Sequence, residues 1–211
     1  VDELNRASPK VQSAFLEAMQ ERQVTIDGES FELDEPFMVI ATQVPYPGAG
    51  TYSLTDVQID RFAFKVDLGY PDPGDEVEIM ARIDQIESDR GSTVLDPVDI
   101  QLLSAETRNV FVHKRIRTYI QGIVSELRGN RYIRMGPSTR ASIWLMKGSR
   151  ALALVEGRKY VIPDDVKNLA RYVLPHRLEL SSQARADNFS SNNLVMEALG
   201  KVAVPKGVFK E

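Results

Sequence analysis

The sequence contains no cysteine, and only two of its 211 residues are histidines. The lack of cysteine excludes disulfide bonds, thiolate catalysis and cysteine-ligated zinc. His113 and His176 are far apart in the chain and could supply only part of a metal site. No apolar run approaches the roughly 20 residues of a membrane-spanning helix, and the N-terminus shows no signal-peptide pattern. These absences favour a cytoplasmic protein that does not insert into membranes.

The sequence also lacks a large excess of either charge, because 26 basic residues nearly balance 30 acidic ones and the net charge is −4. A domain that binds nucleic acid through its bulk charge is strongly basic, so we expect no nucleic-acid partner. Hydrophobic residues make up 43% and charged residues 27%, as is typical of a soluble globular protein. The length is sufficient for one or two compact domains.

A phosphate-binding P-loop is the third absence. Such a loop has the pattern G-x-x-x-x-G-K-[ST], in which backbone amides and a lysine surround the phosphates. Lys201 follows Gly200 but is followed in turn by Val202, and residues 48–50 (Gly-Ala-Gly) have no lysine after them. The sequence therefore contains no P-loop.

The residues that are present predict a mixed α/β structure up to about residue 70. Ser8 and Pro9 open a helix that continues at helical spacing to about residue 22. Asp27-Gly28 between two apolar runs predicts a β-hairpin. The continuous apolar run at residues 37–42 and the alternating pattern at residues 62–68 predict two further strands. Residues 44–50, rich in proline and glycine, predict a loop.

Residues 71–74 (Pro-Asp-Pro-Gly) mark the clearest boundary in the chain, and the pattern after them is helical. We predict helices at residues 75–87, 96–110, 116–127, 138–156, 163–173 and 191–199. The predicted fold class is therefore α/β followed by all-α, with a first domain at residues 1–70 and a second at residues 71–211.

Two features of the first part are candidates for nucleotide chemistry. Nucleotide hydrolysis needs one carboxylate to organise Mg²⁺ and another to orient the attacking water, and Asp2-Glu3 could supply both. Most Asp-Glu pairs are solvated surface residues, so the dipeptide alone does not decide between a catalytic pair and a surface pair. Arg61 is either a surface residue paired with Asp60 or an arginine finger, a residue that contributes roughly 10³–10⁵-fold to the rate in a neighbouring subunit.

Arg140 is the candidate in the second part. It falls in the first turn of a predicted helix, where the helix dipole disfavours a cation. A phosphate bound between Arg140 and the helix amides would explain a cation there. The alternative is that the side chain extends into solvent at a cost of a few tenths of a kcal/mol, as is typical of such dipole effects, and both remain open.

The chain resembles the MoxR family of AAA+ ATPases in many short segments, which occur in the same order as in that family. The similarity covers most of the chain, and a long series in the correct order is more specific than any one motif. The segments that carry it are residues 2–10, 16–21, 24–28, 39–43, 59–62, 136–141, 150–153, 157–158, 163–167 and 176–178.

The resemblance implies a ring, usually hexameric, that hydrolyses ATP with Mg²⁺ at subunit interfaces to remodel or assemble partner proteins. Proteins with a von Willebrand A domain are frequent partners in this family. The fold implied is part of an AAA+ P-loop NTPase core followed by a helical lid. Asp2 matches the Mg²⁺ ligand of the Walker B motif, Glu3 its water-activating carboxylate, Arg61 the arginine finger and Arg140 the sensor 2 arginine. The hairpin around residues 27–28 matches an insertion before sensor 1.

The sequence departs from the family pattern in two respects. The asparagine usual at sensor 1 is replaced by Val44, and Gln43 is the candidate substitute although strand parity aims it the other way. The P-loop half is lacking; we expect it upstream of Val1 and predict no ATPase activity for these 211 residues alone. The rival hypothesis is a non-catalytic AAA+-derived binding or assembly module, and a nucleic-acid helper ATPase is a weaker third.

Overall fold

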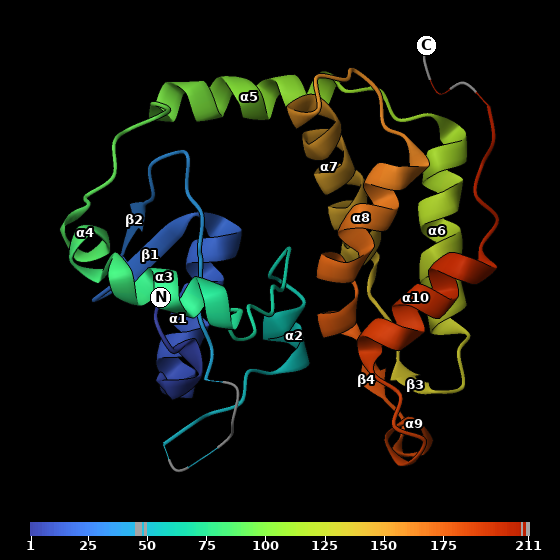
Figure 1. Ribbon diagram of the computed structural model, residues 1–211, viewed down its shortest axis with the longest axis horizontal. Helices are drawn as coiled ribbons and strands as arrows, with labels where there is room; N and C mark the ends of the chain where they lie inside the picture. Colours follow the sequence, from blue (N-terminus) through green and yellow to red (C-terminus); the bar gives the residue numbers. More distant parts are fainter. Residues whose placement is uncertain (45–47, 49, 208, 210–211) are drawn as a thin grey trace.

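The computed structural model describes residues 1–44, 48, 50–207 and 209 of the chain. A mixed α/β part, coloured blue to cyan in Figure 1, lies beside a helical bundle coloured yellow-green to red. The succession of α/β and then all-α structure confirms the predicted fold class. Four residues of the predicted loop at 44–50, namely 45–47 and 49, lie outside the described residues.

The first part confirms the predicted helix and hairpin. Helix α1 (Pro9–Glu21) leads into an antiparallel pair of strands, β1 (Gln23–Ile26) and β2 (Glu29–Glu32). Both turn residues have a positive φ, 51° at Asp27 and 86° at Gly28. A type I′ turn requires this conformation, which is why Asp-Gly predicted the hairpin.

The strand predicted at residues 37–42 is wrong. Among the described residues its backbone is bonded to the first four residues of the chain: the Val1 nitrogen donates to Ile40 O at 2.7 Å, Thr42 N donates to Val1 O at 3.0 Å, and Leu4 N donates to Thr42 O at 2.9 Å. A strand needs a continuous ladder of bonds to a neighbour. Within the described residues the neighbouring chain turns away into the short helix η1 (Leu4–Arg6).

The strand predicted at residues 62–68 is also wrong, because this segment lies against helices and not against another strand. Its Lys65 N–H donates to the carbonyl of Tyr172 at 2.9 Å. The ring of Phe64 lies close to Gly148, where an added Cβ would be 3.4 Å from Cζ of the ring. Packing against the bundle therefore holds residues 62–68 in place of a ladder of hydrogen bonds to a neighbouring strand.

The helix predicted at residues 75–87 is in fact two helices, α3 (Pro73–Ala81) and α4 (Ile83–Ser88). The interruption is at Arg82, whose φ and ψ are −112° and 9°. Its N–H is shared between the carbonyls of Glu78 and Ile79, so the last turn of α3 tightens before α4 begins.

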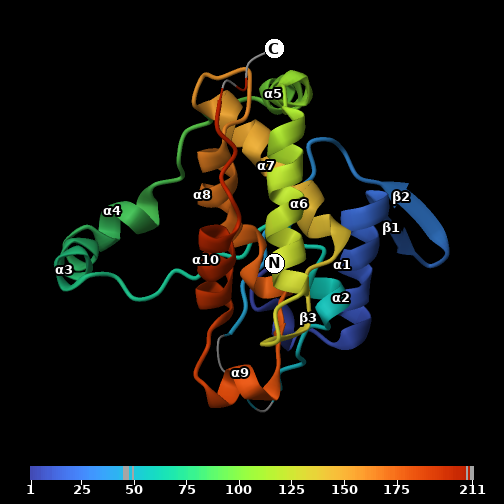
Figure 2. The same ribbon diagram turned by 90° about the vertical axis from the view of Figure 1, so that its right-hand side faces the viewer.

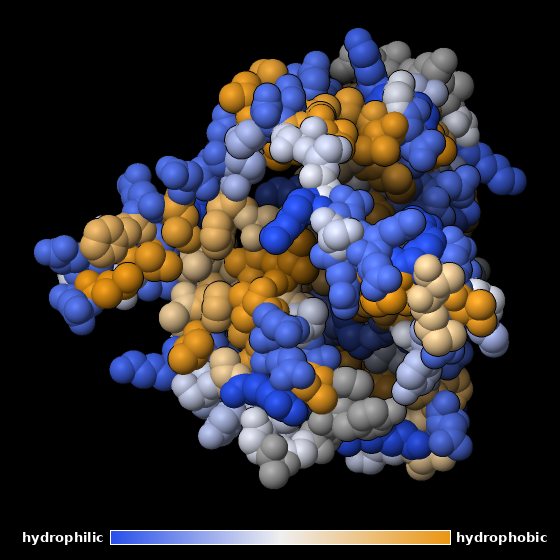
Figure 3. Space-filling view, turned by 60° about the vertical axis from the view of Figure 1, so that its left-hand side comes forward, coloured by the Kyte–Doolittle hydropathy of each residue, from blue (hydrophilic) through white to orange (hydrophobic). Residues whose placement is uncertain are grey.

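Helix α5 (Pro97–Asn109) confirms a predicted helix and runs along the top of Figure 1 toward the bundle. Neither it nor α3 or α4 buries a residue. Apolar side chains such as Met80 (64% exposed) and Leu102 (63%) face solvent. Figure 3 shows apolar side chains gathered around a hollow on the face that lies to the left in Figure 1. Tertiary packing therefore contributes little to the stability of these three helices.

The hydrophobic core lies in the helical bundle, which faces the viewer in Figure 2. It consists of α6 (Lys114–Arg128), α7 (Thr139–Val155), α8 (Pro163–Val173) and α10 (Ser191–Lys201), each at a predicted position. The apolar residues of α6 that recur at helical spacing are all buried: Ile116, Tyr119, Ile120, Ile123, Val124 and Leu127.

Short elements that were not predicted close the bundle at one end. Strands β3 (Ile133–Met135) and β4 (Glu179–Leu180) pair with each other. Helix η2 (Pro175–Arg177) follows α8, and α9 (Ser182–Ala186) follows β4. Helix η2 matters most, because it faces the first part of the chain.

A buried ion pair fixes the start of α8. Asp165, 3% exposed, accepts bonds from both terminal nitrogens of Arg158 at 2.9 and 2.5 Å and from the Ile162 N–H at 2.9 Å. We predict that Asp165→Asn lowers the free energy of unfolding by about 2–3 kcal/mol, because a buried donor loses its charged acceptor. Urea titration measures the change. Asp164→Asn, at an exposed neighbour, is the control, and equal losses in both variants would contradict the prediction.

Candidate nucleotide-sensing site

Asp2 and Glu3 are held beside the end of the apolar segment 37–44 by one hydroxyl group. Thr42 Oγ1 donates to Asp2 Oδ1 at 2.5 Å and accepts from the Glu3 N–H at 2.8 Å. Asp2 is exposed and Glu3 is half-buried. Thr42 therefore orients the carboxylate of one candidate and the backbone of the other.

Glu3 has a left-handed backbone conformation, with φ 47° and ψ 52°. For a residue other than glycine this conformation costs on the order of 1–3 kcal/mol and persists only where the surroundings enforce it. Here the bond from Glu3 N–H to Thr42 and the bond from Leu4 N–H to the Thr42 carbonyl, 2.9 Å long, enforce it. The Glu3 carboxylate pairs with Arg6 at 3.0 Å at the surface, and so remains accessible to a ligand.

Val44, at the position that the resemblance assigns to sensor 1, lies against an asparagine. Asn5 Nδ2 donates to Val44 O at 3.1 Å, and Val44 N donates to Asn5 Oδ1 at 3.0 Å. Both polar atoms of the Asn5 side chain are thus used on backbone. Gln43 is exposed, and its side chain makes no hydrogen bond within the described residues.

A second group of residues surrounds Asp60, which follows the short helix α2 (Asp56–Ile59). Ser138 Oγ donates to both carboxylate oxygens, at 3.0 and 2.8 Å, and Arg140 Nη1 lies 3.4 Å from Oδ2. Arg177 Nε donates to Oδ1 at 3.0 Å. We call Asp60, Ser138, Arg140 and Arg177 the Asp60 cluster. It joins the first part of the chain to α7 and η2 of the bundle.

The cluster bears on the predicted role of Arg140. Ser138 Oγ also accepts from the Arg140 N–H at 3.1 Å and so caps α7. An anion does lie beside the first turn of this helix, as the dipole argument requires, but it is the carboxylate of Asp60. The Arg140 side chain is still 47% exposed, and its contact to Asp60 is long. A phosphate could therefore approach it.

Arg177 is the most buried member of the cluster, with a side chain that is 1% exposed. Besides Asp60 Oδ1, its guanidinium donates to the carbonyls of Asp60 at 3.1 Å, Phe62 at 2.5 Å and Ala63 at 3.3 Å, and to that of Val173. Burial lowers the pKa of Arg177 from its ordinary value, while the charge of Asp60 raises it. The guanidinium remains charged at any physiological pH.

His176 lies next to this guanidinium and is neutral near pH 7. Burial, and then the charge of Arg177, lower its pKa to about 4. Its Nε2 lies 3.2 Å from the carbonyl of Phe62 and 2.6 Å from Arg177 Nη1. His176 thus packs against the segment after Arg61 as a structural group.

Arg61 makes no ion pair within the described residues, and its Nε and Nη1 are buried without a hydrogen-bond partner there. The alternative in which Arg61 is a surface residue paired with Asp60 is therefore wrong, because Asp60 pairs with Arg140 and Arg177. Buried donors without acceptors are costly. An anionic ligand would satisfy them once the side chain turns outward, because both atoms are closed to solvent as they lie.

The structure thus places the predicted residues in two groups, Asp2 and Glu3 in one and Arg61 and Arg140 around the other. No hydrogen bond or ion pair in the described part of the chain joins Asp2 or Glu3 to Arg61 or Arg140. Sequence reasoning assigned no site role to Thr42, Asp60 or Arg177, although all three lie in segments that carry the family resemblance.

The ligands offered by these residues fit Mg²⁺ and a nucleotide. Asp2 and Thr42 present oxygen atoms, the ligands Mg²⁺ prefers. Among the described residues no group of three or more acidic, histidine or cysteine side chains could hold a metal ion. Mg²⁺ usually binds one or two carboxylates together with substrate phosphates, so a single Asp2 is sufficient.

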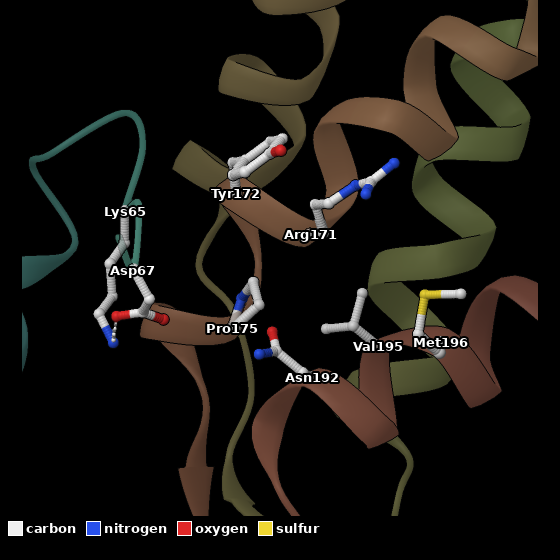
Figure 4. Close-up of a pocket in the computed structure, with 8 residues that line it drawn as sticks. All are labelled: Lys65, Asp67, Arg171, Tyr172, Pro175, Asn192, Val195 and Met196. Atoms are coloured by element: carbon white, nitrogen blue, oxygen red, sulfur yellow. Dashed lines mark ion pairs between the residues drawn. The ribbon is translucent and has the colours of Figure 1, made fainter. Parts of the chain in front are cut away.

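A hollow of about 240 Å³ lies elsewhere, between residues 65–67, the end of α8 and α10 (Figure 4). Lys65 and Asp67 at its edge pair with each other at 3.0 Å. Arg171 is the remaining charged side chain of the lining, and none of the predicted nucleotide-binding residues contributes to it. The nucleotide candidates lie outside it.

In the part of the chain that the structure describes, every helix is too short or too polar to cross a membrane. The ATPase family associated with various cellular activities (AAA) matches residues 1–64, and the AAA lid domain matches residues 125–198. The two matches fall on the first part of the chain and on the bundle.

Relatives match almost the whole chain. "Uncharacterized protein YeaC" of Bacillus subtilis is 42% identical over 97% of the chain, and "Chaperone MoxR1" of Mycobacterium tuberculosis is 40% identical over 97%. The chain spans 64% and 56% of their respective lengths. A crystal structure of a candidate ATPase from Cytophaga hutchinsonii is 36% identical with a TM-score of 0.90, covering 98% of this chain and 66% of that one.

Proposed function

The chain belongs to the MoxR family of AAA+ ATPases, and on that premise we propose that the protein hydrolyses ATP at the subunit interfaces of a hexameric ring. The energy would be used to remodel or assemble partner proteins. The observation that carries the proposal is the Asp60 cluster, which ties the sensor 2 candidate Arg140 to the residue just before the finger candidate Arg61. The Asp60 carboxylate contacts Arg140, and Arg61 follows Asp60 directly in the chain.

The two carboxylates at the N-terminus have different roles in this proposal. Asp2, oriented by Thr42, would hold Mg²⁺, which when bound neutralises charge on the phosphates. Glu3, accessible and held in a strained backbone conformation, would orient the attacking water and accept its proton. Arg61 would stabilise the charge that develops on the phosphates of a neighbouring subunit's ATP.

Arg140 would report the state of the nucleotide to the bundle. Its contact to Asp60 is 3.4 Å long, and a phosphate competes well with a long, partly exposed ion pair. When Arg140 moves to the phosphate, Asp60 keeps its bonds to Ser138 and Arg177. The bundle would thus respond to ATP without losing its connection to the first part of the chain.

The partners and the domain division are further parts of the proposal. The Mycobacterium relative is named a chaperone, which supports client proteins as partners here, and von Willebrand A domain proteins are the class we propose. We assign residues 1–70 to the nucleotide-binding core and residues 71–211 to the lid, and we place the protein in the cytoplasm. The buried bundle core, which lies wholly after residue 109, supports a separate lid.

The test is an ATP hydrolysis assay of the full-length gene product. We expect turnover that requires Mg²⁺, stops with EDTA and rises in specific activity with protein concentration, because the sites need two subunits. The 211-residue chain alone, which has no P-loop, is the control and should show no turnover. Absence of both nucleotide binding and turnover in the full-length protein would contradict the enzyme proposal.

A non-catalytic binding or assembly module is the second candidate function. It is favoured by Val44, whose side chain cannot hydrogen-bond a phosphate or water, and by Gln43, which is exposed and unbonded within the described residues. The same assay separates the two, because a module of this kind would bind nucleotide and form rings with no turnover.

A further inference from the structure

We propose that Arg177 is a positioning residue that sets the place of the arginine finger; this inference rests on the proposed role of Arg61. Arg177 does not touch Arg61 itself. It binds the backbone on both sides of it, through the carbonyls of Asp60, Phe62 and Ala63. The finger therefore projects from a segment whose backbone is held from the lid.

The acceptors that Arg177 binds are mainly backbone carbonyls, and this distinguishes a positioning role from ordinary side-chain packing. A guanidinium is a rigid planar fork of donors, so its bonds to three carbonyls within residues 60–63 and to one carboxylate fix the path of the backbone that it faces. These contacts do not depend on the side chains of residues 62 and 63. Lysine, with a single nitrogen, could keep the contact to Asp60 but could not hold the three carbonyls together.

Two further contacts of the segment lead to the same anchor, beside one bond from the Phe62 N–H to Ile59 O of α2 at 3.1 Å. Lys65 N–H donates to Tyr172 O at 2.9 Å, and His176 Nε2 lies 3.2 Å from Phe62 O. Tyr172, His176 and Arg177 all lie at the end of α8 or on η2. The segment that follows Arg61 is thus bound to the lid and to no strand of the described structure, so the lid sets the finger's position.

A finger acts only when its donors meet the phosphate, and a displacement of about 1 Å can cost on the order of 100-fold in rate. Arg177→Met should therefore lower the turnover of the full-length ring roughly 100-fold. ATP affinity should be retained, since the residues proposed to hold the nucleotide are untouched. Arg171→Met, at an exposed arginine on the same helix end, is the matched control and should leave turnover unchanged.

Mixed rings provide the decisive readout. A subunit with Arg177→Met keeps its own carboxylates but supplies a misplaced finger, whereas a subunit with Glu3→Gln has the opposite defect. Rings that mix these two variants should recover turnover. At some interfaces the correctly placed Arg61 of a Glu3→Gln subunit meets the intact carboxylates of an Arg177→Met subunit. Rings that mix Arg177→Met with Arg61→Ala should not recover, because both lack a working finger.

The outcomes separate this inference from the function on which it rests. If Arg61→Ala and Glu3→Gln do not complement each other, the proposed finger role itself fails. If that pair complements but Arg177→Met and Glu3→Gln do not, Arg177 does not act through the finger and the inference is overturned. Recovery of turnover in mixtures of Arg177→Met with Arg61→Ala would overturn it as well.

Hydrogen exchange tests the same idea without activity. In Arg177→Met we expect the amides of Arg61, Phe62 and Lys65 to exchange at least tenfold faster while the core amides of α6 stay protected. Loss of protection throughout the bundle would show a purely structural role and overturn the inference. If Arg177→Met does not fold, Arg177→Lys serves instead, with the same expectations for the mixed rings.

Discussion

Arg61→Ala is expected to lower ATP turnover of the full-length ring by roughly 10³–10⁵-fold, the range that arginine fingers contribute. The free energy of unfolding should not fall through a lost hydrogen bond or ion pair, because the buried Nε and Nη1 of Arg61 have no partner among the described residues and their removal relieves unsatisfied donors. A variant that loses activity and keeps its stability would locate the loss in the transition state. Steady-state kinetics together with thermal melting provide both measurements.

Arg82→Ala is the matched control for this experiment. Arg82 is a 58% exposed arginine that pairs with Glu78 one turn earlier, far in the sequence from either candidate group. An exposed pair of this kind contributes less than about 1 kcal/mol, so neither turnover nor stability should change appreciably. Equal turnover in Arg61→Ala and wild type, measured in assembled rings, would exclude a finger role.

The parts of the fold that could be predicted from the sequence are those that complete their own hydrogen bonds. The apolar positions of α6 recur at helical spacing, and the helix forms where predicted because its bonds close within the segment. The hairpin at Asp27-Gly28 is local in the same way. Residues 37–42 form an equally clear apolar run, but a strand there requires hydrogen bonds to a neighbouring strand. The apolar run does not show whether such a strand lies beside it.

The candidate site divides along similar lines. Glu3 and Arg140 carry chemical types that suggested a role, and resemblance to a family gave them one. Thr42 and Arg177 were missed because their partners lie 39–40 and 114–117 residues away, at Asp2, Glu3 and the segment around Asp60. An isolated threonine or arginine carries no mark of such contacts. Distance along the chain, and not weakness of the interaction, hid these residues.

Glu3→Gln is expected to lower turnover by roughly 10²–10⁴-fold, because an amide cannot accept the proton of the attacking water. The shape of the side chain and the backbone bond to Thr42 are kept, so ATP should still bind and remain unhydrolysed on the ring. Loss of the exposed pair with Arg6 should cost less than about 1 kcal/mol of stability. Single-turnover assays with retained nucleotide measure both the slowed step and the binding.

The control for this variant is Glu78→Gln, which removes an exposed carboxylate of the same type from α3. It should leave turnover and nucleotide retention unchanged. If Glu3→Gln hydrolyses ATP as fast as wild type, the carboxylate that activates water is not Glu3. If Glu3→Gln instead loses ATP binding, the role of Glu3 is in holding the nucleotide, and the division of labour between Asp2 and Glu3 is wrong. Retained binding with blocked turnover is the result that only a water-activating Glu3 explains, because a ligand of Mg²⁺ would affect both.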